Sequence, residues 1–215
     1  MSGVLIVSGT DTGIGKTVVA AGLAAALGAH YWKPVQAGTE DGTDSERAIA
    51  LGVPPDLVLR EGYRLALPAS PHLAFRAEGL EVDPVRLTLP EPRPLIVEGA
   101  GGLMVPLRRD PPWLMIEQFA RWQAPVLLVA RTALGTINHS LLSVEGLRTR
   151  GIPIAGLLFV GEAHEENEVV IPALTGVLHV GRLPLLDPLD APALAQAMAA
   201  HIDLAHLRAI MDNPV

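Results

Sequence analysis

The stretch Val4–Thr17, Val-Leu-Ile-Val-Ser-Gly-Thr-Asp-Thr-Gly-Ile-Gly-Lys-Thr, joins a short apolar run to a glycine-rich loop and to the start of an alanine-rich segment. The apolar run is typical of a strand buried on both faces, and Lys16–Leu27 is typical of a helix. Glycines in such a loop let backbone N–H groups approach an anion, and the helix N-terminus adds its dipole. The stretch therefore predicts a phosphate-binding loop between a strand and a helix.

Within this loop, Gly13, Ile14 and Gly15 lead into Lys16 and Thr17. The lysine would neutralise the β- and γ-phosphates, and the threonine hydroxyl is placed to coordinate Mg²⁺. The spacing departs from the usual G-x-x-x-x-G-K-[ST], because the upstream glycine lies one residue too early. The alternative is a loop that only resembles a phosphate site, but the strand–loop–helix context favours binding of ATP or GTP.

Lysine is confined to two positions, because 14 of the 16 basic residues are arginine. Lys16 closes the phosphate loop, and Lys33 opens the motif Lys33-Pro34-Val35. An ammonium is a compact point charge on a flexible stem, suited to a phosphate oxygen or a substrate carboxylate. Both lysines are therefore candidate functional residues.

Along the whole chain, short β-type runs alternate with helix-type segments. The expected strands are Val4–Ser8, His30–Val35, Pro94–Glu98, Val126–Ala130, Ile154–Val160 and Val177–Leu183. The expected helices are Lys16–Leu27, Ser45–Leu51, Trp113–Gln123, Ile137–Arg150, Glu165–Leu174 and Ala191–Ala200. This alternation predicts an α/β, P-loop NTPase-type three-layer fold, with a mostly parallel sheet covered by helices on both faces. A proline-rich excursion from Val53 to Pro92 is expected to hold helices near Pro71–Gly79 and Pro84–Leu89, and residues 1–215 are expected to form a single domain.

Composition excludes several classes of protein. The net charge of −7 argues against a sequence-independent nucleic-acid binder. The absence of cysteine excludes disulfides, thiolate metal sites and thiol nucleophiles. No apolar run approaches the roughly 20 residues that span a bilayer, and the N-terminus shows no signal-type segment. We expect a soluble cytoplasmic protein with no membrane partner.

Two acidic residues are candidate metal ligands. Glu98, in Glu98-Gly99-Ala100-Gly101-Gly102, follows an expected strand and precedes an expected glycine-rich turn, where an open α/β sheet presents ligand groups. Asp44 sits at an expected helix N-cap, so capping is an alternative to metal binding. The nearby acids Glu40, Asp41 and Glu46 compete with Asp44 for the role of ligand.

The segment Leu134–His139 is expected to begin a helix after the strand Val126–Ala130. Free backbone N–H groups at such a start suit a second anion, for example a substrate carboxylate. An ordinary cap by Thr136 is the alternative, and the sequence does not decide between the two.

Taken together, these segments resemble the ATP-dependent dethiobiotin synthetase family of biotin synthesis. The matching segments, in chain order, are Gly9–Thr17, Lys33–Val35, Asp44, Ser70–His72, Glu98–Gly102, Leu134–His139 and Gly181–Leu186. The extra residue in the phosphate loop is the family's own form. Lys-Pro-Val, Glu-Gly-Ala-Gly-Gly and Gly-x-Ile-Asn-His are the specific elements.

The resemblance implies a reaction of 7,8-diaminononanoate with CO₂ and ATP in the presence of Mg²⁺. One amine captures CO₂ as a carbamate, the γ-phosphoryl group passes to that carbamate, and the second amine closes the ring and releases phosphate. Positioning and charge stabilisation would supply most of the rate.

The resemblance also implies roles for individual residues. Lys33 would hold the carbamate, Lys16 the transferred phosphoryl group, and Thr12 the diamine or carbamate. Thr17, Asp44 and Glu98 would bind the metal. The remaining implied contacts with ATP are Gly13–Thr17, Gly99, Ala100, Gly101, Pro184, Leu185 and Leu186. The substrate carboxylate would be bound by Gly135, Thr136, Ile137 and Asn138 of a partner subunit, which implies a homodimer with shared sites.

Three positions depart from the family pattern. Ala37 replaces a hydroxyl residue that would touch substrate, and Gly13 stands where some members carry a carboxylate. Val160 and Gly161 occupy the place of an Asn-Asp pair that would read the base, so turnover of other nucleoside triphosphates is a hypothesis.

Two other protein classes share parts of this pattern. A P-loop switch of the partitioning or cell-division type carries a second lysine early in the loop, where this chain has Asp11. Its membrane-bound version ends in a basic amphipathic helix, whereas the tail from His201 suits a packed or solvated helix. The ATP-dependent amidases of cobalamin synthesis append a glutaminase domain with a cysteine nucleophile, which this chain lacks.

Overall fold

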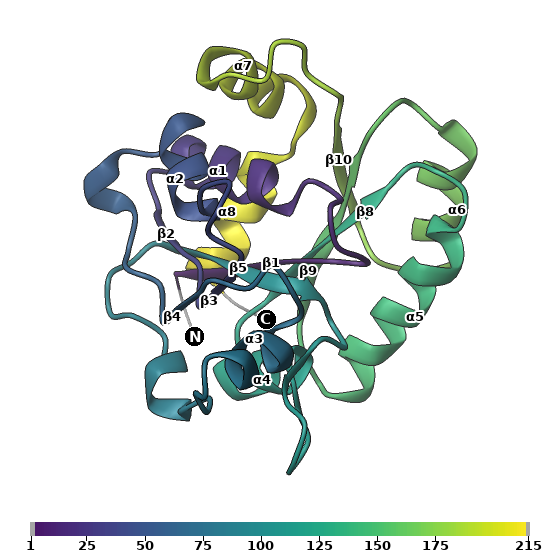
Figure 1. The fold of residues 1–215 in the computed structure, drawn as a ribbon. Coiled ribbons are helices and arrows are strands. Elements are labelled where there is room, and N and C mark those ends of the chain that lie inside the picture. The colour runs from purple at the N-terminus through teal and green to yellow at the C-terminus, as the bar shows by residue number, and fades with distance from the viewer. Residues whose placement is uncertain (1–2, 214–215) are drawn as a thin grey trace.

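The computed structural model describes residues 3–213. Its centre is a six-stranded parallel sheet in the order β10-β9-β8-β1-β5-β2 (Figure 1). The strands are β1 Val4–Gly9, β2 His30–Trp32, β5 Leu95–Gly102, β8 Val126–Arg131, β9 Ile154–Val160 and β10 His179–Leu183. Because β1 lies between β5 and β8, connections diverge to two sides at its carboxyl end, which is where open α/β sheets bind ligands.

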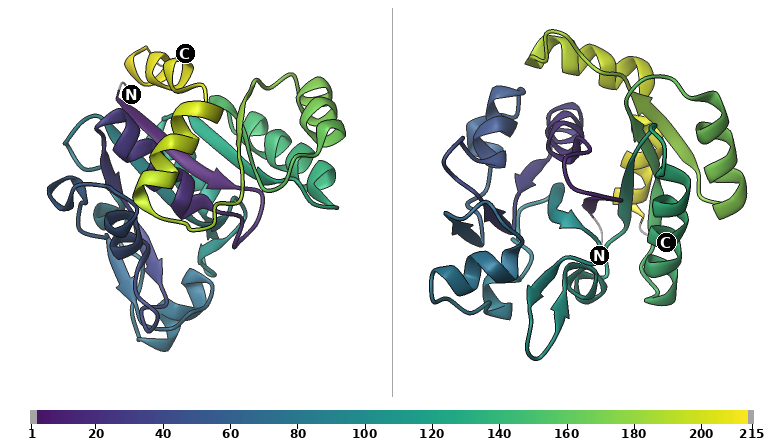
Figure 2. Two further views of the ribbon diagram at one scale, coloured as in Figure 1. Left: turned by 90° about the horizontal axis from the view of Figure 1, so that it is seen from above. Right: turned by 45° about the vertical axis from the view of Figure 1, so that its right-hand side comes forward.

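Helices cover both faces of this sheet (Figure 2). One face carries α1 Lys16–Leu27, α2 Asp44–Ala50, α7 Ala191–His201 and α8 Leu204–Asp212. The other carries α3 Pro71–Ala77, α4 Met115–Trp122, α5 Thr136–Thr149 and α6 Glu165–Thr175. A hydrophobic core lies on each face of the sheet, and β1 contributes to both. Val4 and Ile6 belong to one core, and Leu5 and Val7 belong to the other. The three-layer α/β arrangement expected from the sequence is confirmed.

Helix α1 begins and ends at the residues expected from the sequence. Its N-cap is Gly15 with φ 94° and its C-cap is Gly28 with φ 62°, both in the left-handed region that favours glycine. A Cβ atom on Gly15 would lie 3.1 Å from Cγ1 of Val160. The phosphate loop therefore packs directly against the end of β9.

Two strand predictions were wrong, one at Lys33–Pro34 and one after Glu98. The expected strand His30–Val35 is divided, because β2 ends at Trp32 and β3 Val35–Ala37 pairs with β4 Tyr63–Leu65 in a separate sheet. Pro34 has no N–H for a ladder, which accounts for the break. The expected turn after Glu98 is instead strand, since β5 continues to Gly102 and pairs there with Gly9. Glu98 therefore projects from a paired strand rather than from a loop.

The excursion between Val53 and Pro92 contains the two expected helical segments. They are α3 and the 3-10 helix η2 Pro84–Leu87, and they are accompanied by β4 and by η1 Pro55–Leu57. Trp113 does not begin a helix, as it was expected to do. It lies in β7 Trp113–Leu114, which pairs with β6 Pro106–Arg108, and α4 starts at Met115.

The tail forms the packed helix α8, with Leu207 and Met211 buried. Within residues 3–213, every helix is too short or too polar to cross a membrane.

Candidate active site

A cavity of about 770 Å³ opens at the carboxyl ends of β1, β2 and β5. Its walls come from the phosphate loop, the break between β2 and β3, the start of α2, the end of β5 and the segment before α3. The expected site residues that line it are Thr12, Gly13, Gly15, Lys16, Thr17, Lys33, Ala37, Asp44, Glu98, Ala100 and Gly101. The tertiary structure thus brings together motifs that are scattered over nearly 90 residues of sequence.

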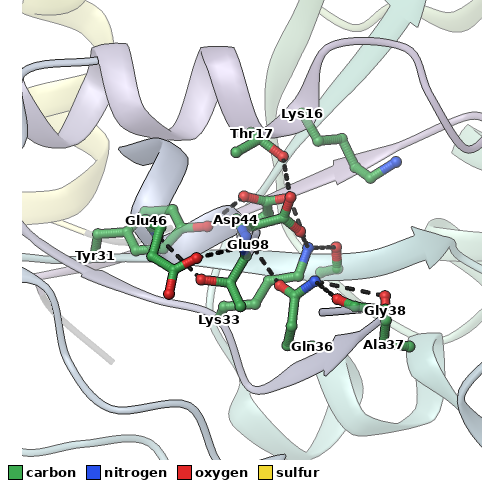
Figure 3. Close-up of polar contacts among 12 residues, drawn as sticks. Lys16, Thr17, Tyr31, Lys33, Gln36, Ala37, Gly38, Asp44, Glu46 and Glu98 are labelled. Carbon is green, nitrogen blue, oxygen red and sulfur yellow. Dashed lines mark hydrogen bonds and ion pairs between the residues drawn. The ribbon is translucent and has the colours of Figure 1, made fainter. Parts of the chain in front are cut away.

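Thr17, Lys33, Asp44 and Glu98 meet in one polar cluster on the cavity wall (Figure 3). The Lys33 Nζ lies 2.5 Å from Oδ2 of Asp44 and 2.7 Å from Oε1 of Glu98. The Thr17 hydroxyl lies 3.1 Å from Oδ1 of Asp44 and 2.9 Å from Oε1 of Glu98. One cation and one hydroxyl are therefore shared between two carboxylates.

Asp44 is free to join this cluster because another residue caps its helix. The N-cap of α2 is Thr43, whose hydroxyl accepts from the Glu46 N–H while the Glu46 side chain accepts from the Thr43 N–H. The prediction that Asp44 is the cap was wrong by one residue. Glu46 is occupied by the cap, and neither Glu40 nor Asp41 is among the residues lining the cavity. Among the four acids considered, only Asp44 is placed to contact the cluster.

The opposite charges in the cluster stabilise the ionised forms of Lys33 and Asp44. Burial alone would lower the pKa of Lys33, but Glu98 and Asp44 outweigh it and raise that pKa above its ordinary value. Burial alone would raise the pKa of Asp44, but the charge and hydrogen bond of Lys33 lower it, with help from Thr17. Lys33 is therefore an ammonium at neutral pH despite being 5% exposed.

Lys16 extends away from this cluster (Figure 3). Its Nζ donates to the backbone carbonyl of Asp11 at 2.8 Å, inside its own loop. Burial and the nearby charge of Lys33 lower the pKa of Lys16 to about 8. The side chain of Asp11 forms an ion pair with Arg131 at the end of β8, which ties the loop to the sheet. A carboxylate therefore occupies the position where a partitioning-type loop has its second lysine.

The donor set of the cluster fits a hard cation. The Thr17 hydroxyl and the carboxylates of Asp44 and Glu98 are all oxygen donors, which Mg²⁺ prefers in proteins. No group of three or more His, Cys, Asp or Glu side chains suited to a metal occurs within residues 3–213. The arrangement thus fits a magnesium ion that takes further oxygens from phosphate and water, and it does not resemble a zinc centre.

Three polar side chains at the site were not anticipated from the sequence. The Tyr31 hydroxyl donates to Oε2 of Glu98 at 2.6 Å. Gln36 accepts from the Asp44 N–H at 3.1 Å and so links β3 to the start of α2. Arg47 lines the cavity one helical turn after Asp44. Tyr31 had a signal in the sequence, because it lies two residues before Lys33 and side chains at this spacing would share a face of the strand expected over His30–Val35.

A second cavity of about 360 Å³ adjoins the first along Gly13, Gly15 and Val18. Its walls are mostly apolar, and among the described residues 3–213 Arg131 is the one lining residue with a polar side chain. The expected nucleotide-binding residues in its wall are Ile14, Pro184, Leu185 and Leu186. Val160 also lines it, whereas Gly161 does not and instead donates its N–H to the Leu183 carbonyl at 3.1 Å. An apolar slot beside a phosphate loop is suited to a flat ring.

Two expected regions lie outside the main cavity. Gly99 does not line the cavity, and its carbonyl lies 3.5 Å from the Lys33 Nζ. The segment Gly135–Asn138 starts α5 but does not line the cavity. Gly135 is the N-cap with φ 91°, and the hydroxyl of Thr136 is buried without a hydrogen-bond partner among residues 3–213. The alternative in which Thr136 caps the helix is therefore wrong.

The fold and the loop define the protein as a P-loop NTPase. Two solved structures share this fold, as the chain matches a ParA family ATPase from Chlorobium tepidum with a TM-score of 0.55 and 11% identity, over 98% of this chain and 96% of that one. It matches the MinC:MinD cell division complex of Aquifex aeolicus with a TM-score of 0.50 and 10% identity, over 99% and 97%. Residues 3–193 also match a family model described as an AAA domain.

Relatives of much higher identity define the family. An ATP-dependent dethiobiotin synthetase of Novosphingobium aromaticivorans is 55% identical over 90% of this chain and 94% of its own length. Another, of Afipia carboxidovorans, is 53% identical over 97% of this chain and 100% of its own. The chain belongs to the ATP-dependent dethiobiotin synthetase family. It is an ATP-dependent ligase of biotin synthesis.

Proposed function

We propose that this enzyme converts 7,8-diaminononanoate, CO₂ and ATP into dethiobiotin, ADP and phosphate, with Mg²⁺. The observation that carries the proposal is the meeting of Lys33 with Thr17, Asp44 and Glu98 in a cavity that also contains the phosphate loop. A buried, charged ammonium beside a triphosphate site suits a carboxylated intermediate that must accept a phosphoryl group.

The first step requires stabilisation of a carbamate. A neutral amine of the diamine attacks CO₂, a C–N bond forms, and the amine proton leaves for solvent. The carbamate carries a negative charge, which Lys33 would bind as an ammonium, since Glu98 and Asp44 raise its pKa. In this structure Lys33 is bound to those two carboxylates, so the same side chain would exchange one anionic partner for another. Thr12, on the cavity wall, would contact the amine or the carbamate.

The second step is phosphoryl transfer. A carbamate oxygen attacks the γ-phosphorus, the bond to the β-phosphate oxygen breaks, and ADP leaves. Lys16 would turn from the Asp11 carbonyl to the transferred group, and Gly13, Ile14 and Gly15 would contribute backbone to the phosphates. A magnesium ion held by Thr17, Asp44 and Glu98 would neutralise phosphate charge and align the γ-phosphoryl group. The second amine then attacks the mixed anhydride, closes the ring and expels phosphate.

The adenine would occupy the apolar cavity beside Pro184, Leu185 and Leu186. Hydrogen-bonding side chains that could read the base are scarce there, because glycine, proline and aliphatic residues form its wall beside Arg131. We therefore propose that selection for adenine is weak.

We further propose a homodimer whose sites are shared. Gly135–Asn138 lies outside the cavity of its own chain, and the adjacent Leu134 is fully exposed, as Leu142 is in large part. These apolar side chains suit burial against a second copy, which would bring the start of α5 to the partner's cavity and its free N–H groups to the substrate carboxylate. We propose that residues 1–215 act as one domain in the cytoplasm, with no nucleic-acid or membrane partner.

The direct test is an assay with the diamine, labelled bicarbonate and Mg-ATP. Acid-stable label in a cyclic urea, dependent on both the diamine and ATP, is the expected result. Phosphate release without the diamine, with no urea formed in its presence, would overturn the proposal.

A further inference from the structure

We propose that Tyr31 is a positioning residue that fixes the carboxylate of Glu98 for the metal. This inference rests on the magnesium part of the proposed function. It starts from a single contact, in which the Tyr31 hydroxyl donates to Oε2 of Glu98 at 2.6 Å (Figure 3). Neither partner is accessible to solvent, as Tyr31 is 0% and Glu98 1% exposed.

The two oxygens of Glu98 have different partners. Oε1 faces the cavity side of the cluster, where it accepts from Lys33 at 2.7 Å and from Thr17 at 2.9 Å. Oε2 accepts from Tyr31, which comes from the body of the sheet. Substrate and nucleotide would draw Lys33 and Thr17 away from Oε1, whereas Tyr31 would remain bound to Oε2.

The sheet explains why Tyr31 reaches this oxygen. In the parallel pairing of β2 with β5, Tyr31 is opposite Ile96. Glu98 lies two residues further along β5 and thus on the same face of the sheet as Ile96. Tyr31 and Ile96 belong to the same core, under α1 and α2, so the phenol is packed as well as bonded.

This arrangement has a consequence for the reaction. When Lys33 moves to the carbamate, Glu98 loses a donor at Oε1, and Tyr31 still prevents rotation of the carboxylate. A buried carboxylate oxygen without a donor is costly, and a metal ligand held by a second residue binds its metal more tightly. Tyr31 therefore keeps Oε1 directed at the metal throughout the cycle.

The experiment compares ADP binding by calorimetry with EDTA and with increasing Mg²⁺. Tyr31→Phe is the test variant, and Tyr63→Phe is its matched control. Tyr63 is the only other tyrosine of the chain. It is also buried, and its hydroxyl accepts from the Asp83 N–H at 2.6 Å, away from the cluster.

In wild type, Mg²⁺ is expected to tighten ADP binding. In Tyr31→Phe the Mg²⁺ concentration needed for this tightening should rise roughly tenfold, as it does when other residues that hold a metal ligand are lost. The affinity for ADP in EDTA and the KM for the diamine should stay within about twofold of wild type. Tyr63→Phe should retain the wild-type Mg²⁺ response. A wild-type response in Tyr31→Phe, or an equal loss in both variants, would overturn the role of Tyr31. No Mg²⁺ response in wild type would instead defeat the proposed metal site.

A second measurement needs no change at Tyr31. Labelling with 3-fluorotyrosine gives two fluorine signals, which Tyr63→Phe assigns. Addition of Mg²⁺ to the ADP complex should shift the Tyr31 signal and leave the Tyr63 signal in place. An unmoved Tyr31 signal would contradict the inference, even if Tyr31→Phe failed to fold.

Discussion

The starts of α1 and α5 are built alike but placed differently. Each follows the end of one of two neighbouring strands, β1 and β8, and each has a glycine N-cap with a left-handed φ, 94° at Gly15 and 91° at Gly135. Neither cap makes a side-chain hydrogen bond. Both starts therefore have the backbone geometry of an anion site.

The two helix starts differ in the residues that surround them. The start of α1 lines the main cavity, with Lys16 and Thr17 beside the carboxylates of the cluster. The start of α5 does not line that cavity, and Gly135 and Asn138 are exposed. The difference is one of enclosure, because other segments surround the start of α1 and form a cavity with it. At α1 these segments come from the same chain, and at α5 we propose that they come from a second copy.

The largest effect is expected at the enclosed site. Lys33→Arg should lower turnover at least about 100-fold, because a broad guanidinium cannot take the place of a point charge at a developing anion. Binding of ADP, measured by calorimetry, should stay within about twofold. Arg60→Ala, an exposed arginine away from the cavity, is the control. Near-normal turnover in Lys33→Arg would remove Lys33 from its proposed role.

The next effect tests whether the α5 start serves a partner. Asn138→Asp should raise the KM for the diamine roughly tenfold, since an acid would repel the substrate carboxylate. At diamine concentrations well below the wild-type KM, coexpression of Asn138→Asp with Lys33→Arg subunits should restore about a quarter of wild-type activity, because half of random dimers would carry one intact shared site. Coexpressed subunits no more active than the two separate homodimers would place Asn138 in the site of its own chain.

A smaller effect concerns the apolar cavity beside the phosphate loop. Wild type should turn over CTP and GTP within about tenfold of ATP, because an apolar slot discriminates weakly between flat rings. Val160→Asn adds a hydrogen-bonding group at similar volume and is expected to increase the preference for one base. Steady-state kinetics with the three nucleotides measures this, and strict ATP dependence of wild type would contradict it.

The smallest effect is a pH dependence at Lys16. Because burial and Lys33 lower its pKa to about 8, the free protein loses this charge as pH rises past that value. ADP affinity should fall a few-fold between about pH 7.5 and 9, with proton uptake on binding near pH 8, since phosphate favours the charged form. Lys16→Arg should bind without that uptake. Equal proton uptake in both proteins, measured by calorimetry in two buffers, would assign it to another group.

Much of the fold could be predicted because its signals are local. Helix α1 was predicted to the residue, since Gly15 and Gly28 mark its two ends. Strands such as Ile154–Val160 were equally clear from their apolar runs. The errors fell at Lys33–Pro34, after Glu98 and at Trp113, where pairing with another segment decides whether a residue lies in a strand.

Prediction of the site was limited in the same way, by side-chain contacts that the motifs do not specify. The motifs identified Lys16, Thr17, Lys33 and Glu98, but the choice of Asp44 over its acidic neighbours depended on a cap that uses Thr43 and Glu46. Tyr31 was missed because its contact with Glu98 joins residues that are 67 positions apart.

By itself, the sequence determined the phosphate loop, the alternation of strands and helices, and the family, because each depends on residue type and short spacing. The tertiary structure decided which side chains form hydrogen bonds and ion pairs with one another. It placed Lys33 between two carboxylates, fixed Glu98 through Tyr31, and left the start of α5 outside the cavity. These outcomes depend on strand order and register, which place distant residues within a few ångströms of one another and which short motifs do not encode.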